Sequence, residues 1–206
     1  MGNRIILSVA IFCFVICVGS VYAALIDRGT GMIYDTELGI TWLQDANYAR
    51  TELSDSRVDE IIASVDTVDG HTLSTLDFIE IDGEYVGKMT WWGALAWADQ
   101  LVYGGFDDWR LPHILPVNGI SFNDSYLSYD GSTDYGYNIG APGSAYPGST
   151  GSEMAYMYYN NLGNECLIGT HIPGQGLVNI GDFTNLAGAS YWSDLEYRPP
   201  SEYAWY

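Results

Sequence analysis

The segment from Thr90 to Gly105 constrains the fold of this chain more than any other part of the sequence. Thr90 is an expected N-cap, because its hydroxyl can accept a free backbone N–H of the first helical turn. Glycines at 104 and 105 are typical of the residues that end a helix. Apolar side chains recur at helical spacing between these limits, at Trp91, Ala94, Leu95, Ala98 and Leu101. The sequence therefore predicts a helix over residues 90–101 with one apolar face.

Shorter elements precede this helix. Residues 25–43 read as a hairpin, since two β-prone runs flank the turn-forming residues 35–39. Residues 54–65 have an apolar face at helical spacing, and Ser54 or Asp55 can cap them. Residues 76–81 and 84–88 flank Asp82 and Gly83, a pair that is a strong signal for a tight hairpin turn.

The second half of the chain is less regular. Residues 108–111 are expected to form a short buried strand, and residues 152–162 a second helix that Gly163 ends. Residues 116–152 are rich in Gly, Ser, Tyr, Asp and Asn, as in a long loop. Further short strands are expected at residues 177–180, 191–192 and 203–206. This mixed order predicts one α+β domain with two or three helices packed on short antiparallel strands.

The first 23 residues have the pattern of a secretory signal peptide. Arg4 supplies a positive start, an apolar run follows from Ile5 to Val18, and residues 21–23 form a small-x-small cleavage site. We expect cleavage before Ala24, which leaves residues 24–206 as the secreted domain, in the extracellular space or the periplasm. An uncleaved membrane anchor is the alternative, although the apolar run is shorter than the roughly 20 residues of a typical span.

The charge of the chain restricts its partners. The sequence has 26 acidic and 7 basic residues, a formal net charge of −19. Like charges repel within a Debye length, which argues against nucleic acid, anionic lipid and sulfated glycans as ligands. Signal cleavage also removes Cys13 and Cys17, so Cys166 is left as a single thiol that has no partner for an intramolecular disulfide.

Several short segments together resemble a known family. They are residues 39–43 (GITWL), 91–98 (WWGALAWA), 108–112 (DWRLP), 152–156 (SEMAY), 191–193 (YWS) and 204–206 (AWY). In this order they resemble the Lcl C-terminal domain family of secreted bacterial proteins, over about residues 25 to 206. The resemblance implies a C-type-lectin-like arrangement and an association with cell surfaces, adhesion and glycan binding; fold alone does not fix function.

The chain departs from the family pattern at two places. The family follows Trp-Arg-Leu-Pro with Thr and a short acidic helix, whereas here His113 to Pro116 follow, and a proline breaks a helix. The family also continues past Ala-Trp-Tyr through another pair of strands, whereas this sequence stops at Tyr206. A truncated C-terminus that lacks the closing strands is therefore one interpretation.

Arg110 is the most informative charged residue, because it lies between a tryptophan and a Leu-Pro pair in an acidic chain. A buried cation must be paired or hydrogen-bonded, and arginine can meet a carboxylate with two parallel bonds. Asp107, Asp108 and Glu153 are candidate partners, and Glu153 is preferred because it opens the second helix. We expect an interior structural anchor made of Trp109, Arg110, Glu153, Trp91 and Trp192. A clamp for a substrate carboxylate or sulfate is the alternative.

Residues 116–152 supply the candidate recognition residues. Tyrosine combines a flat apolar face with a polar tip, which suits partly wet recognition surfaces. The candidates for contact with a glycan or a protein are Tyr126, Tyr129, Tyr135 and Tyr137, with Tyr146 in the same region. Burial of these rings in the core is the alternative.

The same region offers oxygen ligands. Asp124, Asp130 and Asp134 lie in a Gly-rich run, and calcium takes six to eight oxygens from flexible backbone. Their spacing does not follow the EF-hand pattern. We therefore expect a solvated polar loop without a cofactor, and a calcium site is the alternative.

Catalytic signals are weak. Cys166 and His171 could form a nucleophile–base pair, and His113 with His171 could bind zinc, but neither spacing matches a known motif. We expect a non-enzymatic, secreted binding or adhesion module for a neutral glycan or a cell-surface or matrix protein. A homo-oligomeric structural subunit of a surface or matrix assembly, and an extracellular hydrolase, are the alternatives.

Overall fold

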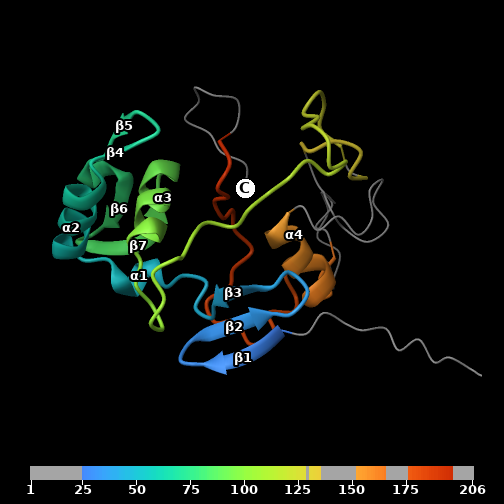
Figure 1. The fold of residues 1–206 in the computed structure, drawn as a ribbon, viewed down its shortest axis with the longest axis horizontal. Coiled ribbons are helices and arrows are strands. Elements are labelled where there is room, and N and C mark those ends of the chain that lie inside the picture. Colours follow the sequence, from blue (N-terminus) through green and yellow to red (C-terminus); the bar gives the residue numbers. More distant parts are fainter. Residues whose placement is uncertain (1–24, 129, 136–151, 166–175, 197–206) are drawn as a thin grey trace, which may run out of the picture.

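The computed structural model describes residues 25–128, 130–135, 152–165 and 176–196. It has an α+β fold built from short helices and three small antiparallel sheets, as the sequence predicts. Figure 1 shows α2, α3, β6 and β7 gathered on one side, and the β1–β3 sheet with α4 on the other. In the part of the chain that the structure describes, no helix has the length and apolar character of a membrane span.

The first sheet has three strands, one more than the expected hairpin. It consists of β1 (Leu25–Gly29), β2 (Met32–Asp35) and β3 (Ile40–Leu43), in that order and antiparallel. The turn between β2 and β3 is organised by the buried carboxylate of Asp35, which accepts the N–H groups of Glu37 and Leu38 at 3.0 Å. Asp35 therefore has a folding role that turn composition alone does not reveal.

Two helices follow the sheet. They are α1 (Ala49–Glu52) and α2 (Asp55–Val65), and the Ser54 hydroxyl caps α2 by accepting the Arg57 N–H. The two-residue strands β4 (Thr67–Val68) and β5 (His71–Thr72) pair with each other, and the 3-10 helix η1 (Thr75–Asp77) comes next. The predicted helix at 54–65 is confirmed, with Ser54 as its cap.

The predicted hairpin and the clearest helix are both present. Strands β6 (Phe78–Ile81) and β7 (Glu84–Met89) pair around Asp82 and Gly83, whose φ angles are +55° and +83°. Thr90 caps α3 (Trp91–Asp99) through the Gly93 N–H. The helix ends before the expected glycines, because Gln100 caps it and Leu101 turns into the core. Gly104 and Gly105 instead lie in a turn between Tyr103 and Phe106.

The second predicted helix begins as expected and then widens. Ser152 caps α4 (Glu153–Tyr156) by accepting the Ala155 N–H, and the chain continues as a π-helix, η2 (Met157–Asn161). Gly163, with a φ of +65°, follows the end of this unit.

Three strands expected in the second half do not form. Residues 108–111, 177–180 and 191–192 carry no strand. At residues 177–180 a side chain takes the place of strand pairing. The Asn164 amide oxygen accepts the N–H groups of Val178 and Asn179 at 2.9 and 2.8 Å. Residues 203–206 lie outside the described residues.

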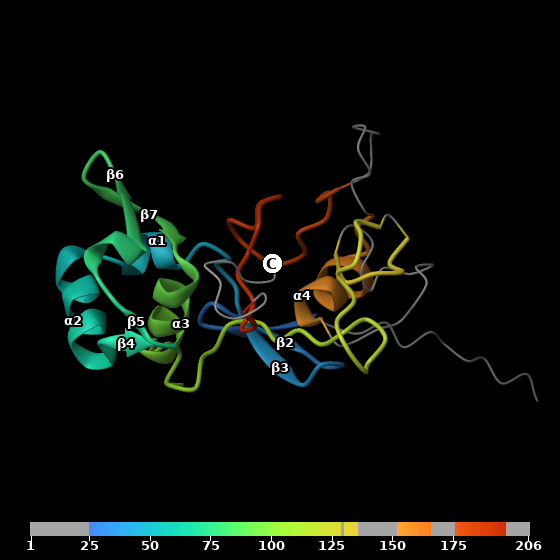
Figure 2. The ribbon, with the colours of Figure 1, turned by 90° about the horizontal axis from the view of Figure 1, so that it is seen from above.

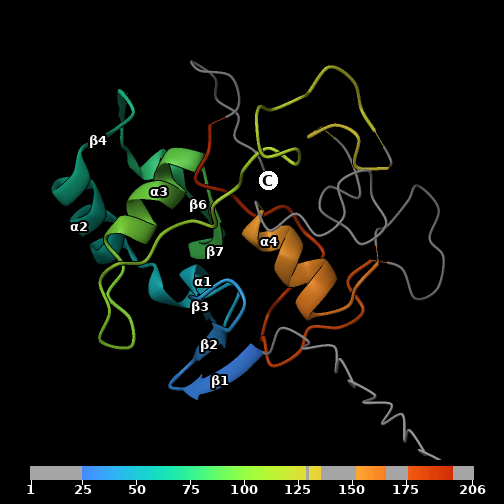
Figure 3. The same ribbon diagram turned by 45° about the vertical axis from the view of Figure 1, so that its right-hand side comes forward.

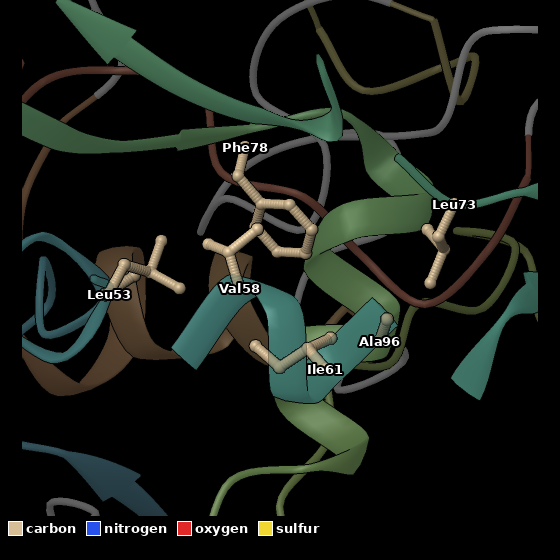
Figure 4. Close-up of a cluster of buried hydrophobic side chains, with 7 residues drawn as sticks. Leu53, Val58, Ile61, Leu73, Phe78 and Ala96 are labelled. Carbon is tan, nitrogen blue, oxygen red and sulfur yellow. The ribbon is translucent and has the colours of Figure 1, made fainter. Parts of the chain in front are cut away.

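Among the described residues, the apolar core is divided into three clusters. The first joins α1, α2, β6 and α3 with Leu73, which precedes η1, and Figure 4 shows it around Val58, Ile61 and Phe78. The second places Trp91, Ala94, Ala98 and Leu111 together. The third packs Ile33 of β2 against Met157 and Leu162 of the second helical unit, as the position of α4 beside the first sheet in Figure 3 shows.

Segments far apart in the sequence join the two sides of the molecule. Thr184 exchanges backbone hydrogen bonds with Gln44 (2.8 Å) and Ala46 (2.9 Å), just after β3. The indole of Trp91 donates to the Ser193 carbonyl at 2.8 Å, and the indole of Trp192 donates to the Met89 carbonyl at 2.9 Å. The residues near 180–195 thus hold both sides together without forming a sheet.

Candidate functional site

Arg110 and Glu153 form the pair that the sequence favours. Two parallel bonds run from the guanidinium to the carboxylate, at 2.8 Å from Nη1 and 2.7 Å from Nη2. Nη1 also donates to the Leu111 carbonyl at 3.0 Å. The expectation of an interior position is wrong, because half of the Arg110 side chain is exposed, against 13% for Glu153. The segment from 107 to 110 runs along the surface, so only the carboxylate is covered.

A second pair adjoins the first. The Nδ1 atom of His113 lies 2.6 Å from Oδ2 of Asp194, and the His113 backbone N–H donates to Glu153 at 2.7 Å. The Asp194 N–H donates to the Pro112 carbonyl at 3.0 Å. We call Arg110, His113, Glu153 and Asp194 the polar junction. It ties the segment after α3 to the start of α4 and to the segment near 194.

The charges of the polar junction support one another. Burial alone would raise the pKa of Glu153, but hydrogen bonds from Arg110 and from the His113 N–H, with the positive charge of Arg110, hold that pKa below its ordinary value. The hydrogen bond to Glu153 raises the pKa of Arg110 against the opposing effect of burial, and Asp194 adds to this. The arrangement favours the ionised pair, which suits a structural tie.

The tryptophans expected in the anchor do not surround Arg110 as one group. Trp91 is buried in the second core cluster and Trp192 packs at its edge. Trp109 is half-buried, donates to the Tyr103 carbonyl at 3.3 Å, and meets the Tyr103 ring edge-on. The five residues predicted to form one anchor therefore lie in three separate contacts: Trp91 with Trp192, Trp109 with Tyr103, and Arg110 with Glu153.

Residues 116–128 and 130–135, which we call the tyrosine segment, fold around one carboxylate. Asp134 is buried, and its two oxygens accept the N–H groups of Val117 and Asn123, both at 2.7 Å. The Asp134 N–H in turn donates to the Asn123 carbonyl at 2.7 Å. A segment without helix or strand is thereby held in a defined shape.

A buried hydroxyl pair adds to this order. Thr133 is fully buried, and its hydroxyl contacts the Ser128 hydroxyl at 2.9 Å and the Tyr126 carbonyl at 2.8 Å. The Ser128 N–H donates to the Tyr135 carbonyl at 2.9 Å. Three polar side chains of the segment, Ser128, Thr133 and Asp134, are thus buried and hydrogen-bonded to one another or to its backbone.

Several large side chains of the segment are exposed, although Val117 is buried. Tyr126 and Tyr135 are 57% and 51% exposed. The Tyr126 hydroxyl lies 3.3 Å from the Ser132 hydroxyl, a polar group that stands beside the exposed ring. Other large apolar side chains left exposed in or beside this segment are Leu115, Ile120 and Leu127. A polar interior with an apolar, aromatic exterior is the arrangement of a contact surface.

The three aspartates considered for calcium do not gather. Among the described residues, no group of three or more His, Cys, Asp or Glu side chains is placed to hold a metal ion. Both oxygens of Asp134 are occupied by backbone N–H groups, and the exposed Asp130 accepts the Ser132 N–H at 3.0 Å. Asp134 therefore organises the segment from within, and Asp124 and Asp130 are not placed with it as ligands.

Several candidates lie outside the described residues. They are Tyr129, Tyr137, Tyr146, Cys166 and His171. Of the pair considered for zinc, only His113 is described, and its Nδ1 is directed at Asp194.

Sequence reasoning missed a buried carboxylate at Asp77. Its oxygens receive the Thr90 hydroxyl at 2.7 Å, the Ser74 N–H at 2.9 Å and the His71 ring at 3.0 Å, and the His71 ring stacks on Trp92. Burial alone would raise the pKa of Asp77, but these bonds lower it. The Ser-x-x-Asp spacing of a capping box was the available signal. These bonds tie η1 to β5 through His71 and to α3 through Thr90, so the group is structural.

Comparisons with known families, curated proteins and solved structures gave no significant match. The resemblance of the quoted motifs to the Lcl C-terminal domain family therefore enters the function below only as a proposal.

Proposed function

We propose that this protein is a secreted binding module of the Lcl C-terminal type, with a C-type-lectin-like arrangement, and that it recognises neutral glycans at a cell or matrix surface. The signal-like start of the sequence supports secretion. The motifs around Trp109–Arg110 and Trp192 support the family, and the α+β fold is compatible with it.

The observation that carries the proposal is the construction of the tyrosine segment. Asp134 and Thr133 fill its interior, while Tyr126 and Tyr135 remain half exposed. An aromatic side chain on a backbone segment that is already ordered loses less conformational entropy when a ligand binds than one on a flexible loop. It therefore contributes more to the binding free energy. The flat apolar faces of the rings suit the apolar faces of sugar rings, and the phenol groups suit sugar hydroxyls.

Charge selects among glycans. The tyrosine segment contains three aspartates and no lysine or arginine. Arg110, the nearest cation in the sequence apart from His113, is already bound by Glu153. An anionic sugar would find no free positive partner here and would meet the repulsion of the whole chain. The ligand is therefore an uncharged glycan.

The test is a glycan array probed with the secreted chain, with and without a calcium chelator. We expect binding to neutral glycans, no binding to sulfated or sialylated ones, and no effect of the chelator. Tyr126→Ala and Tyr135→Ala should each weaken binding about tenfold or more, the loss of one aromatic contact of roughly 1–2 kcal/mol. Phe106→Ala, which removes an exposed aromatic ring outside the segment, is the matched control.

Three outcomes would revise this assignment. A chelator-sensitive signal would restore a calcium site. A blank array with concentration-dependent oligomers would favour a structural subunit of a surface assembly. Turnover of a glycan or peptide that Cys166→Ala abolishes would favour a hydrolase.

A further inference from the structure

Strand β6 is an edge of the two-stranded β6–β7 sheet. Helix α1 packs against β7, where Gly87 lies so close to Asn47 and Arg50 that a Cβ there would collide with them. Strand β6 pairs with β7, and within the described ranges no strand lies on its other side. Figure 2 shows the tip of this hairpin projecting away from the rest of the molecule. An open strand edge offers unpaired main-chain N–H and C=O groups to another chain.

Apolar side chains accompany this edge. Phe78 points into the first core cluster, whereas Ile79 and Ile81 remain 38% and 51% exposed, and Leu76, just before the strand, is 86% exposed. Single exposed apolar residues need no explanation, but several within six residues of an open strand form a contact surface.

Acidic side chains from two elements surround the same hairpin. The Tyr85 hydroxyl of β7 donates to Asp55 at the start of α2 at 3.2 Å, which brings α2 against the hairpin. Burial, Asp55 and the charges of Glu80 and Asp59 together raise the pKa of Tyr85, as expected where acids converge. The exposed acids in and beside the hairpin are Asp55, Asp59, Glu80, Asp82 and Glu84.

Basic side chains do not balance these acids. Arg57 is bound to Glu52 and to the Gln100 carbonyl, with only 21% of its side chain exposed. The exposed cations nearby are Lys88, opposite Ile79 in β7, and Arg50 of α1, which packs against β7, so the acids outnumber them. The open edge is therefore apolar at its centre and strongly negative around it.

We propose that the β6 edge is a docking surface for an extended, basic segment of another protein, which adds as a strand beside β6. Main-chain hydrogen bonds supply the pairing, as in other cases of strand addition. Alternate apolar side chains of the partner contact Ile79 and Ile81. Its lysines or arginines, on the opposite face of the sheet, lie beside Glu80, and Glu84 of β7 is one strand further away. The charge also excludes a second copy of this acidic chain as the occupant.

This surface is separate from the tyrosine segment. Figures 1 and 3 both place the β6–β7 hairpin and the tyrosine segment on different sides of the molecule. Strand addition can therefore be tested independently of glycan binding, and either activity can fail without the other.

The test uses a fluorescent synthetic peptide of alternating lysine and valine, with fluorescence anisotropy as the readout. The control peptide has the same charge, with two central valines replaced by proline to prevent strand pairing. We expect the first peptide to bind the whole chain, the second to bind at least about tenfold more weakly, and affinity to fall between about 50 and 300 mM salt. Hydrogen exchange at the Ile79 to Ile81 amides should slow when the first peptide is added.

Matched variants separate local recognition from overall charge. Glu80→Lys with Glu84→Lys should weaken binding more than Glu37→Lys with Asp99→Lys, which changes the net charge equally at exposed positions elsewhere. Tyr126→Ala should leave peptide binding unchanged. Equal loss for both double variants, equal binding of both peptides, or no binding would overturn the proposal; the acids would then serve only to keep the open edge from aggregating.

Discussion

The Arg110 guanidinium and the Glu153 carboxylate, 43 residues apart in the sequence, meet through two parallel hydrogen bonds at 2.8 and 2.7 Å although half of the Arg110 side chain is exposed. Glu153 also accepts the backbone N–H of His113, so one carboxylate fixes both the start of α4 and the segment after Pro112. The contact between these segments therefore depends more on the largely buried Glu153 carboxylate than on the half-exposed Arg110 guanidinium.

Replacement of that carboxylate tests the tie. Glu153→Gln keeps the size of the side chain but removes the charge that Arg110 and the His113 N–H share. We expect the free energy of unfolding to fall by about 1–2 kcal/mol, less than for a fully buried ion pair because Arg110 is half exposed. Urea denaturation measures it, and Glu84→Gln, an exposed acid with no such contacts, should change stability by less than about 0.5 kcal/mol.

Acid should weaken the same contact in wild-type protein. The pKa of Glu153 is lowered in the folded state, so the folded protein binds a proton there less readily than the unfolded chain. The stabilisation is then complete above the unfolded pKa of about 4.3 and is lost as the pH falls through the lower folded pKa. The stability difference between wild type and Glu153→Gln should narrow over that acidic range in urea denaturation. A difference that stays constant from pH 7 down to the onset of acid unfolding would contradict this account.

The tyrosine segment should lose its shape when Asp134 is changed. In Asp134→Asn, the amide NH₂ would face either the Val117 or the Asn123 N–H, donor against donor, where a carboxylate oxygen now accepts. We expect hydrogen exchange at both amides to accelerate at least about tenfold, which corresponds to the loss of roughly 1–2 kcal/mol of local protection.

The control for that change is Asp130→Asn. Asp130 is exposed and accepts the N–H of the nearby Ser132 at 3.0 Å. It should leave exchange at Val117 and Asn123 as in wild type. Equal acceleration in both variants would show that Asp134 does not organise the segment.

A substitution of Trp91 tests the hydrogen bond that joins α3 to the segment around Ser193. Trp91→Phe keeps an aromatic ring in the second core cluster but leaves the Ser193 carbonyl, at a buried residue, without the indole donor at 2.8 Å. We expect a loss of about 2–3 kcal/mol from the unmet carbonyl and the smaller ring. Thermal unfolding checks this, and a loss below about 0.5 kcal/mol would mean that the bond to Ser193 contributes little.

Gly93 should reject a helix-favouring substitution. Alanine usually stabilises a helix interior by about 1 kcal/mol relative to glycine. Here a Cβ on Gly93 would lie 2.6 Å from the backbone oxygen of Asp77, so α3 and η1 would have to separate. We expect Gly93→Ala to destabilise the protein by about 1–3 kcal/mol. Ser64→Ala, at an exposed position of α2, should be neutral or slightly stabilising, which separates helix propensity from the collision.

Local pattern was sufficient where neighbours in the sequence supply the contacts. Ser54, Thr90 and Ser152 each cap the helix that follows, because an N-cap hydroxyl reaches N–H groups only two or three residues away. Asp82 and Gly83 form their turn because both adopt positive φ. The amphipathic period of residues 55–65 placed Val58 and Ile61 in the core for the same local reason.

Only part of the candidate site could be predicted from the sequence. The preference for Glu153 as the partner of Arg110 is confirmed, and the exposure of Tyr126 and Tyr135 agrees with a contact surface. The partner of His113, 81 residues away, had no signal in the chain. Asp134 resembled a surface ligand by composition, and only its neighbours in space show that it faces inward.

The sequence by itself determined the acidity, the α+β class and the starts of α2, α3 and α4, since these depend on composition or on residues within one turn of each other. Only the tertiary structure decided that residues 177–180 and 191–192 are not strands, that Arg110 lies at the surface, and that Asp134 is buried. Each of these depends on a partner far away in the sequence, at Asn164, Met89, Glu153 or Val117. In residues 177–180, the Asn164 side chain binds backbone N–H groups that a strand would use for pairing. At Trp192, the indole binds the Met89 carbonyl instead of lying on a sheet face. Strand propensity is overridden by such contacts.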